Sequence, residues 1–189
     1  MRNGEATRNK LHTTSLKLFV EKGVTETTVR DIALGAGVAE GTLYRHYASK
    51  DALVEDLFQR NYAAFGRTLA ELARRHEGHR QKLEAMIGGF CRLFDENPHL
   101  FRFLLLAQHQ TLPKLRNGFE NPVQVVRDVI AAAMRAGAIR ARDANLAAGM
   151  VIGLVLQPAV FVVYGRLSPP FSRYVGDIAA ACWQAIGGR

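Results

Sequence analysis

The chain has 189 residues, of which 48% are hydrophobic and 22% charged; this is an ordinary globular composition, long enough to bury a core in one domain or two small ones. The formal net charge of +8 invites a polyanionic partner. Residues 1–50 hold 8 basic and 5 acidic residues, whereas residues 97–189 hold 10 and 4, so charge alone does not place such a partner at the N-terminal end.

Helical periodicity dominates and strand alternation is scarce, so we predict an all-α fold of about nine helices. The expected helices cover residues 7–22, 28–35 with Thr27 as N-cap, 39–47, 50–75, 81–96, 98–112, 122–136, 143–164 and 172–186. The composition changes near residue 50. We therefore expect a DNA-binding domain at 1–50 and a larger body at 51–189, with the helix at 50–75 as their connector.

The polar N-terminus lacks the apolar core of a signal peptide, so a cytoplasmic protein is expected. Cys91 and Cys182 lie in separate apolar runs, which favours buried free thiols over a disulfide. Residues 146–164 are almost long enough to span a bilayer. Gln157 and Pro158 at the centre of this stretch, and amphipathic patterns on either side, favour a buried helix at the heart of the protein and no membrane partner.

The stretch from residue 28 to 50, TVRDIALGAGVAEGTLYRHYASK, has the pattern of a helix-turn-helix. Two short amphipathic segments flank one glycine turn. Ala33 is small enough for close helix packing, Gly37 suits a positive φ angle, and Val38 and Leu43 supply an apolar wedge. The alternative is a corner between two helices of an ordinary helical protein.

The longer stretch LFVEKGVTETTVRDIALGAGVAEGTLYRHYASKDALVEDLF, within residues 8–58, closely resembles the N-terminal domain of TetR-family (tetracycline-repressor-like) transcriptional regulators. The resemblance covers about a quarter of the chain; the rest matches in helical layout alone. It implies a three-helix DNA-binding head, a ligand-binding body, and a homodimer formed by the last two helices.

The resemblance and the helix positions together indicate which residues face DNA. The predicted DNA-binding residues are Thr28, Ala39, Glu40, Gly41, Thr42, Tyr44, Arg45, His46 and Lys50. Thr28 begins its helix, where a hydroxyl and a backbone N–H can bind a phosphate. Glu40, Gly41 and Thr42 open the recognition helix and are expected near base edges. Ala39 departs from the usual serine or threonine of the family and forfeits a helix cap.

The end of the recognition helix carries further candidates. Tyr44 and Arg45 are expected on its exposed side as base-edge or phosphate contacts. His46 and Lys50 resemble phosphate clamps that set register. Tyr47 is expected to pack against the first helix, with a DNA contact as the alternative.

The body offers candidates for dimerisation. Ala148, Gly149 and Gly153 would let helices approach closely, and Ile178 and Ala181 share a face of the last helix. An ordinary intramolecular core is the alternative, and both can hold together.

A ligand pocket in the body is implied by the resemblance, and an apolar or aromatic small molecule fits its composition best. The candidate ligand-binding residues are Phe90, Phe94, Arg102, Gln108, His109, Gln157 and Phe161. Gln157 is the sharpest, because Pro158 frees the carbonyl of Leu154 and a buried glutamine there would need a partner. The aromatic residues also suit a plain core.

Three rival functions remain. An enzyme is not expected, because the sequence has no G-x-S-x-G, phosphate-binding glycine loop or H-E-x-x-H. No cofactor or metal site is expected either, since His76 and His79 fall in a polar break. A ligand-independent, architectural DNA-binding protein is the main alternative to a ligand-responsive regulator, and a membrane-associated protein is the third rival. We predict a repressor that an effector releases from a near-palindromic operator.

Overall fold

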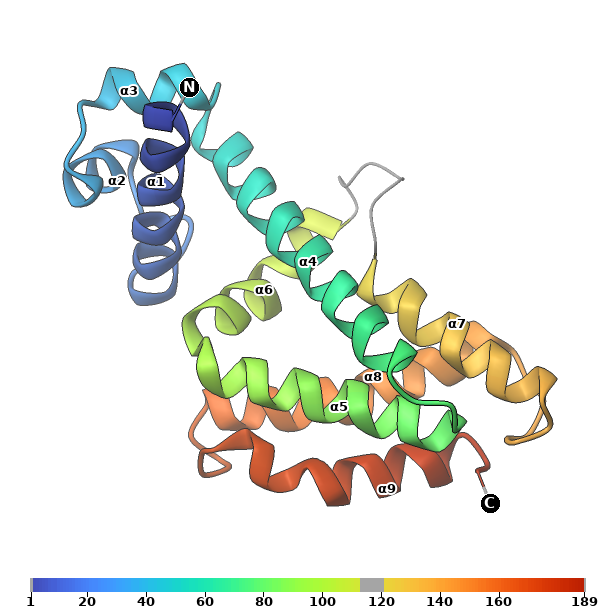
Figure 1. The fold of residues 1–189 in the computed structure, drawn as a ribbon. Coiled ribbons are helices and arrows are strands. Elements are labelled where there is room, and N and C mark those ends of the chain that lie inside the picture. The colour runs from blue at the N-terminus through green and yellow to red at the C-terminus, as the bar shows by residue number, and fades with distance from the viewer. Residues whose placement is uncertain (1, 113–120, 189) are drawn as a thin grey trace. The chain divides into compact units, whose positions relative to one another are not determined.

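The computed structural model describes residues 2–112 and 121–188, and the side chains of residues 2, 3, 106, 109 and 110 fall outside that description. The elements in chain order (Figure 1) are α1 (Arg2–Glu21), α2 (Val29–Ala36), α3 (Glu40–His46), α4 (Lys50–Arg74), α5 (His79–Glu96), α6 (Pro98–Thr111), α7 (Pro122–Arg135), α8 (Ala144–Val163), the 3-10 helix η2 (Phe171–Tyr174) and α9 (Val175–Ala185). The predicted all-α fold is confirmed. Across these two described ranges, β pairing is confined to one isolated bridge between Ile139 and Gly188.

The helices form two compact units. The first contains α1, α2, α3, the part of α4 up to Asn61, and α6. The second contains α4 from Tyr62 onward, α5, α7, α8, η2 and α9. The first unit therefore extends past residue 50 and includes a helix from the middle of the chain. The functional division at residue 50 stays a prediction.

The start of α2 differs by one residue from the expected position. Thr28, not Thr27, is the N-cap, and its hydroxyl accepts a hydrogen bond from the backbone N–H of Asp31. The prediction of Thr27 was wrong because its side chain is fully buried and its hydroxyl donates to the carbonyl of Gly23 at 2.7 Å. Thr27 thus fixes the turn after α1, and the next threonine caps α2.

The turn between α2 and α3 has the expected glycine geometry. Gly37 adopts a left-handed conformation with φ 67°, and its N–H donates to the last turn of α2. A residue with a Cβ would be strained there. Ile32 and Leu43 are fully buried, so α2 and α3 pack through their apolar faces.

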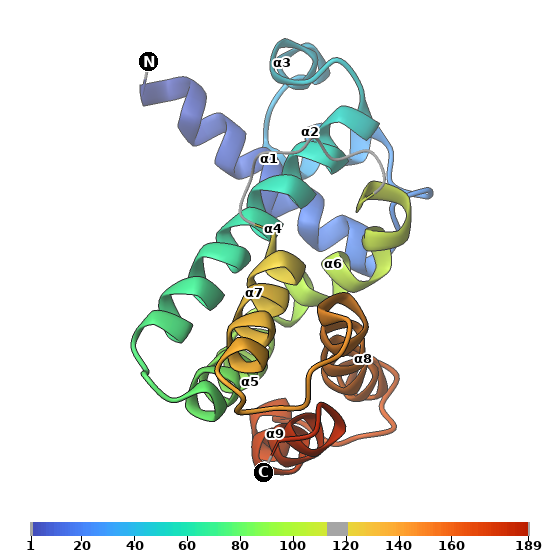
Figure 2. The same ribbon diagram turned by 90° about the vertical axis from the view of Figure 1, so that its right-hand side faces the viewer.

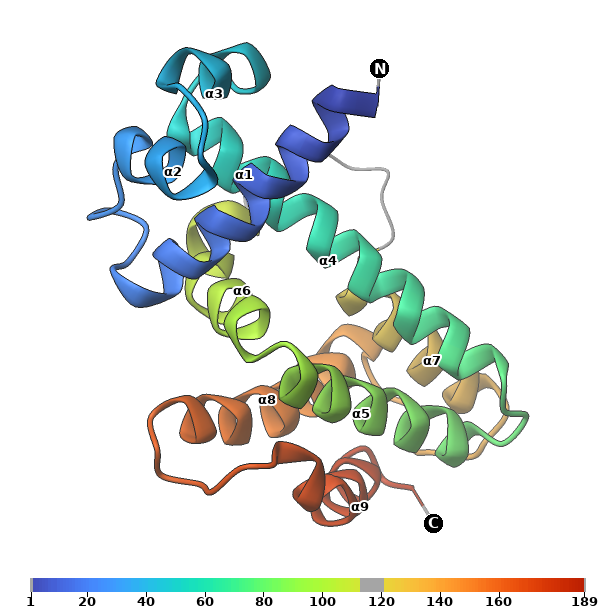
Figure 3. The ribbon, with the colours of Figure 1, turned by 60° about the vertical axis from the view of Figure 1, so that its left-hand side comes forward.

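Aromatic rings form much of the core of the first unit. Phe103 of α6 stacks on Phe19 of α1 with ring centroids 5.8 Å apart, and it contacts Phe58 of α4 edge-on at 6.4 Å. All three rings are buried. Figure 3 shows α1, α4 and α6, the three helices that carry these rings. Helix α6 therefore completes the core beneath the head.

In the second unit, α5 is the central helix and packs against both α7 and α9 (Figure 2). Phe171 of η2 contacts Phe94 and Phe90 of α5 at centroid distances of 5.2 and 6.0 Å. Asp95 accepts hydrogen bonds from the backbone N–H groups of Phe171 and Ser172, at 2.6 and 2.9 Å. The carboxylate thereby holds the start of η2 against α5.

Helix α8 was expected to be a buried helix at the heart of the protein, but in this chain only one of its faces is buried. It buries one face against α7 and α9, made by Ala147, Ala148, Val151, Val155 and Ala159. The opposite face is exposed, with Leu146 60% and Phe161 41% accessible. By length and composition α8 is the one helix in the described part of the chain that could cross a membrane.

Candidate nucleic-acid interface

One face of α3 is open to solvent. Leu43 is fully buried against α2, whereas Tyr44 is 54% exposed and Arg45 is exposed beside it. The guanidinium of Arg45 donates to the hydroxyl of Thr42 at 3.0 Å, so both side chains lie on the same stretch of helix surface. An α-helix with polar and aromatic side chains on one free face fits the major groove of DNA in size.

The N-terminal end of α3 is equally open. Glu40 and Gly41 are exposed, and a Cβ added to Gly41 would meet no atom within 4 Å. Ala39 sits in the N-cap position with an extended backbone and makes no side-chain cap, as predicted. The first backbone N–H groups of α3 therefore receive no side-chain acceptor from position 39, and an added phosphate could supply one.

The hydrogen-bond donors of Thr28, which were expected to bind a phosphate, are occupied within the protein. Its backbone N–H and its hydroxyl both donate to Oδ2 of Asp31, at 2.9 and 2.8 Å. These hydrogen bonds, the backbone one first, lower the pKa of Asp31. A phosphate at the start of α2 would therefore compete with the Asp31 carboxylate for the same donors.

Lys50 contacts the protein itself. Its ammonium donates to the backbone carbonyls of Val24, Thr25 and Thr27 at 2.8, 3.1 and 2.9 Å. Three carbonyls match the three N–H donors of an ammonium group. In the free head Lys50 thus closes the loop between α1 and α2, and its role as a phosphate clamp stays a prediction. His46, the other predicted clamp, is partly exposed beside the ring of Tyr47.

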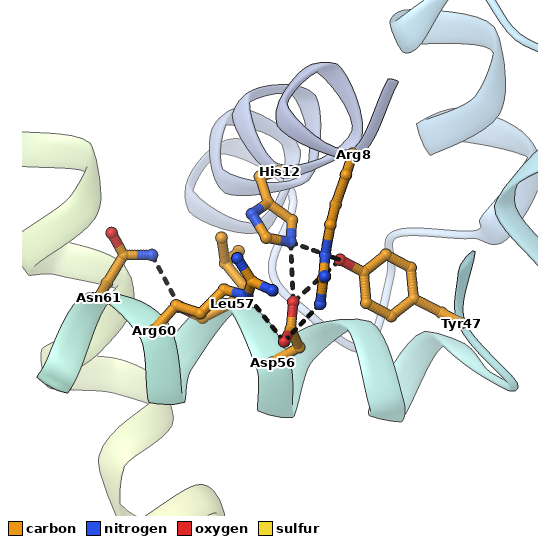
Figure 4. A network of polar contacts seen from close by, with 7 residues as sticks. All are labelled: Arg8, His12, Tyr47, Asp56, Leu57, Arg60 and Asn61. Carbon is orange, nitrogen blue, oxygen red and sulfur yellow. Dashed lines mark hydrogen bonds and ion pairs between the residues drawn. The ribbon is translucent and has the colours of Figure 1, made fainter. Parts of the chain in front are cut away.

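Tyr47 packs in the core, as predicted, and is 5% exposed. Its hydroxyl reaches a polar cluster formed by Arg8, His12, Asp56 and Arg60 (Figure 4). The hydroxyl donates to Asp56 Oδ2 at 2.9 Å and accepts from Arg8 Nε at 2.8 Å. These contacts join the residue directly after α3 to both α1 and α4.

The cluster perturbs its titratable groups. Burial acts to raise the pKa of Asp56, but hydrogen bonds from Arg60, Tyr47 and Arg8 outweigh it and hold the pKa below its usual value. Burial lowers the pKa of His12, although the Asp56 charge opposes this. Both groups therefore favour the state in which Asp56 is ionised and His12 neutral.

None of these four residues was predicted from the sequence to have a role. Arg8 and His12 are spaced i, i+4 on α1, and Asp56 and Arg60 have the same spacing on α4. That spacing places each pair on one helix face, which was the available signal. The pairing of the two faces depends on contacts 44 to 48 residues apart, which helical periodicity does not report.

The predicted ligand-binding residues of the second unit separate into two groups. Phe90 and Phe94 are buried, with ring centroids 6.3 Å apart. Phe161 and Gln157 lie on the exposed side of α8. The prediction of a buried Gln157 was wrong, because it projects opposite to Val155 and Ala159, which face the core.

The remaining ligand candidates belong to α6 in the first unit. Arg102 is exposed, and the side-chain amide of Gln108 donates to the carbonyl of Leu105 at 3.1 Å. The side chain of His109 lies outside the described ones. These residues and the α5 pair thus come from different units, and their joint role in one pocket stays a prediction.

The head matches a known family. Residues 12–57 match the model of bacterial regulatory proteins of the tetR family. Over 52 residues the chain is 46% identical to the HTH-type transcriptional repressor KstR2 of Mycobacterium tuberculosis, a stretch that is 28% of this chain and 26% of the repressor. The KstR2 of Rhodococcus jostii is 42% identical over 52 residues, with the same shares. The match therefore spans about a quarter of these curated relatives.

Solved structures share the fold over nearly the whole chain. The fatty acid degradation regulator FadR from Bacillus halodurans has a TM-score of 0.83 at 16% identity, covering 97% of each chain. FadR from Bacillus subtilis in complex with stearoyl-CoA has a TM-score of 0.79 at 17% identity, covering 92% of this chain and 96% of that one. A TetR family regulator from Marinobacter aquaeolei has a TM-score of 0.81 at 17% identity and full coverage of both. At these identities the likeness shows the fold.

Proposed function

We propose that this chain, whose residues 12–57 match the tetR family of bacterial regulatory proteins, is a cytoplasmic, DNA-binding transcriptional regulator, most simply a repressor. The observation that carries the proposal is the free face of α3. Leu43 holds the helix to the head, while Tyr44 and Arg45 on the other side have room to enter a major groove.

A homodimer is the second part of the proposal. The exposed face of α8 carries Leu146, Leu154 and Phe161, which are 60%, 37% and 41% accessible. Gly149 and Gly153 lie on the same exposed side, and a Cβ at either would meet no atom within 4 Å. A second copy of α8 could approach closely there and cover apolar surface by two-fold symmetry. Two recognition helices would then read the two halves of a near-palindromic operator.

An apolar small molecule is the proposed effector. The sequence favours an apolar or aromatic ligand, and the structure of FadR from Bacillus subtilis in complex with stearoyl-CoA, which has the same fold, supports long-chain acyl thioesters as the first compounds to examine. Helix α4 continues without a break from the first unit into the second. A ligand that favours one position of α4 would therefore alter the head and lower DNA affinity by linkage.

DNA binding is tested with a pool of random duplexes and the purified chain. The wild type should retain a subset of sequences, and Tyr44→Ala should lose that selectivity while keeping its helical circular dichroism. The exposed Tyr164, changed to Phe, serves as a control that leaves binding intact. Retention of no subset by the wild type would contradict the proposed function.

The dimer and the effector have separate tests. Leu154→Glu should convert the chain to monomers in light scattering, whereas Leu34→Glu, on the exposed side of α2, should leave the dimer intact. Stearoyl-CoA should release the selected DNA from the wild type. Continued DNA binding at saturating effector would favour the alternative, a ligand-independent DNA-binding protein.

A further inference from the structure

We propose that Asp56 is a positioning residue for DNA recognition. By accepting a hydrogen bond from the Tyr47 hydroxyl, it holds the recognition helix α3 in the orientation that binds DNA. The proposal rests on the function proposed above and adds that residues remote from the free face of α3 determine its DNA affinity. It concerns one unit of the structure, because α1, α3 and the first half of α4 lie together in it.

Tyr47 is where α3 is fixed at its C-terminal end. It directly follows His46, and its backbone N–H donates to the carbonyl of Leu43 at 2.9 Å, which closes the last turn. Leu43 holds the middle of α3 against α2. The position of the Tyr47 side chain therefore sets how α3 is rotated about that apolar contact.

The hydroxyl of Tyr47 has a partner for each of its hydrogen-bonding positions. It donates to Asp56 Oδ2 at 2.9 Å, accepts from Arg8 Nε at 2.8 Å, and lies 2.6 Å from Nε2 of His12. Nε2 of His12 is also 3.1 Å from Asp56 Oδ2. Since an ionised carboxylate can only accept, Nε2 carries the imidazole proton and shares it between Asp56 Oδ2 and the tyrosine oxygen. The tyrosine oxygen thus donates one hydrogen bond, accepts one from Arg8 and accepts the shared one from His12, and these bonds fix its direction.

Asp56 is itself held from two sides. Its Oδ1 accepts from Nη2 of Arg8 at 2.8 Å and from Nε of Arg60 at 2.9 Å. Arg8 therefore bonds Tyr47 with one nitrogen and Asp56 with another, a fork that a lysine cannot reproduce. Charge-assisted hydrogen bonds of this kind are about twice as strong as neutral ones. The carboxylate links α1, the end of α3 and α4 at a single point (Figure 4).

The hydroxyl is not needed to fill space. A phenylalanine at position 47 would pack the same ring. The hydroxyl therefore contributes to the orientation of the Tyr47 side chain more than to its burial. Asp56 also lies on α4, the helix that continues into the second unit after Asn61. A movement of α4 along its axis would therefore act on Tyr47 and on the orientation of α3. The hydrogen bond between Asp56 and Tyr47 would in this way transmit the proposed effector response to α3.

The experiment compares Tyr47→Phe, Asp56→Asn and Arg8→Lys with the wild type, after circular dichroism confirms that each is folded at the assay temperature. Each variant should bind the selected duplex about tenfold more weakly, because the loss of charge-assisted hydrogen bonds frees α3 to rotate. Affinity for random duplex, and the slope of log affinity against log salt, should stay as in the wild type, since no phosphate contact is lost. The double variant Tyr47→Phe with Asp56→Asn should lose little more than either single one.

Glu21→Gln is the matched control, because it removes an exposed carboxylate at the end of α1 with the same change in charge. It should leave the selected duplex bound as tightly as before.

If Asp56→Asn fails to fold, Arg8→Lys and Tyr47→Phe carry the test. Wild-type affinity in the folded variants would overturn the proposal and leave the cluster a purely stabilising one. Weaker binding of random duplex by Arg8→Lys would also overturn the proposal for Arg8, because it would make the guanidinium a phosphate contact. Failure of the wild type to select any duplex would contradict the proposed function itself.

Discussion

Asp31 accepts two hydrogen bonds from Thr28, one from its backbone N–H at 2.9 Å and one from its hydroxyl at 2.8 Å. The backbone N–H of Asp31 returns one to the Thr28 hydroxyl at 3.0 Å. The start of α2 is thereby capped from both directions. The same donors are those that a DNA phosphate would need, so stability of the helix and binding of the backbone compete at this position.

Asp31→Asn should lower the thermal midpoint of the head and raise its affinity for DNA of any sequence at low salt. The cap is weakened, but the carboxylate no longer competes with a phosphate for Thr28 or repels it. Thr28→Val should instead weaken DNA binding and lower the free energy of unfolding by about 1 kcal/mol, because the hydroxyl is lost from both roles. Thermal unfolding and fluorescence anisotropy with a random duplex measure the two effects. Weaker DNA binding by Asp31→Asn would contradict competition between the Asp31 carboxylate and a DNA phosphate for the donors of Thr28.

Ala39→Ser should stabilise α3. The backbone at position 39 already has the extended geometry of an N-cap, with φ −72° and ψ 149°, and lacks a side-chain acceptor. A serine hydroxyl there can accept an N–H of the first turn, which is worth about 1 kcal/mol. The free energy of unfolding in urea, or the operator affinity, should therefore rise. If neither changed, the missing cap would be of no consequence for this helix.

Lys50→Ala should act on the free protein as well as on DNA binding. The three carbonyls of Val24, Thr25 and Thr27 lose their shared donor, so the loop before α2 should exchange its amide protons faster. If Lys50 also contacts a phosphate when DNA is bound, the slope of log affinity against log salt should fall by about one. Hydrogen exchange and salt titration separate these roles. A change in base preference would contradict the clamp role, and unchanged amide exchange would contradict the role of Lys50 in the loop.

Acidification should destabilise the head through the cluster around Tyr47. The pKa of His12 lies below 6.5 and that of Asp56 below 3.8 in the folded chain. In both cases the unfolded state binds protons more readily, so stability falls as pH decreases. The His12 contribution is lost as pH falls from about 6.5 toward its lowered pKa, and the Asp56 contribution below about 3.8. The charged groups facing His12 are Arg8 on its own helix and Asp56 and Arg60 on α4.

His12→Gln measures this contribution, because glutamine does not titrate. Its free energy of unfolding in urea should depend less on pH just below 6.5 than that of the wild type. Parallel curves for the two proteins over this range would show that His12 does not couple folding to pH.

Helix positions were predictable because local signals mark their ends. Asp143 caps α8 through the N–H groups of Asn145 and Leu146, and Pro122 occupies the first turn of α7. Adjacent threonines limited the accuracy at α2, since either Thr27 or Thr28 could cap the helix by its chemistry. Their different burial decides the matter, and burial depends on the fold.

The faces of α8 were not predictable in the same way. A helix that is apolar on all sides gives no periodic signal for its buried side. The sequence therefore did not indicate that Gln157 lies on the exposed side. The cluster around Tyr47 was missed for a related reason. Arg8 and Asp56 are ordinary charged residues of amphipathic helices, and only their contact at 2.8 Å across 48 residues distinguishes them.

Recognition of DNA by a two-fold symmetric dimer is measured by sequencing the DNA fragments that the purified wild-type chain selects from a random pool. A dimer that presents two copies of α3 should enrich an inverted repeat whose half-sites are centred about one helical turn, roughly 10 bp, apart. Enrichment of that repeat by the wild type, and its loss in Tyr44→Ala, is the predicted result. Fragments without any common inverted repeat would contradict DNA recognition by such a dimer.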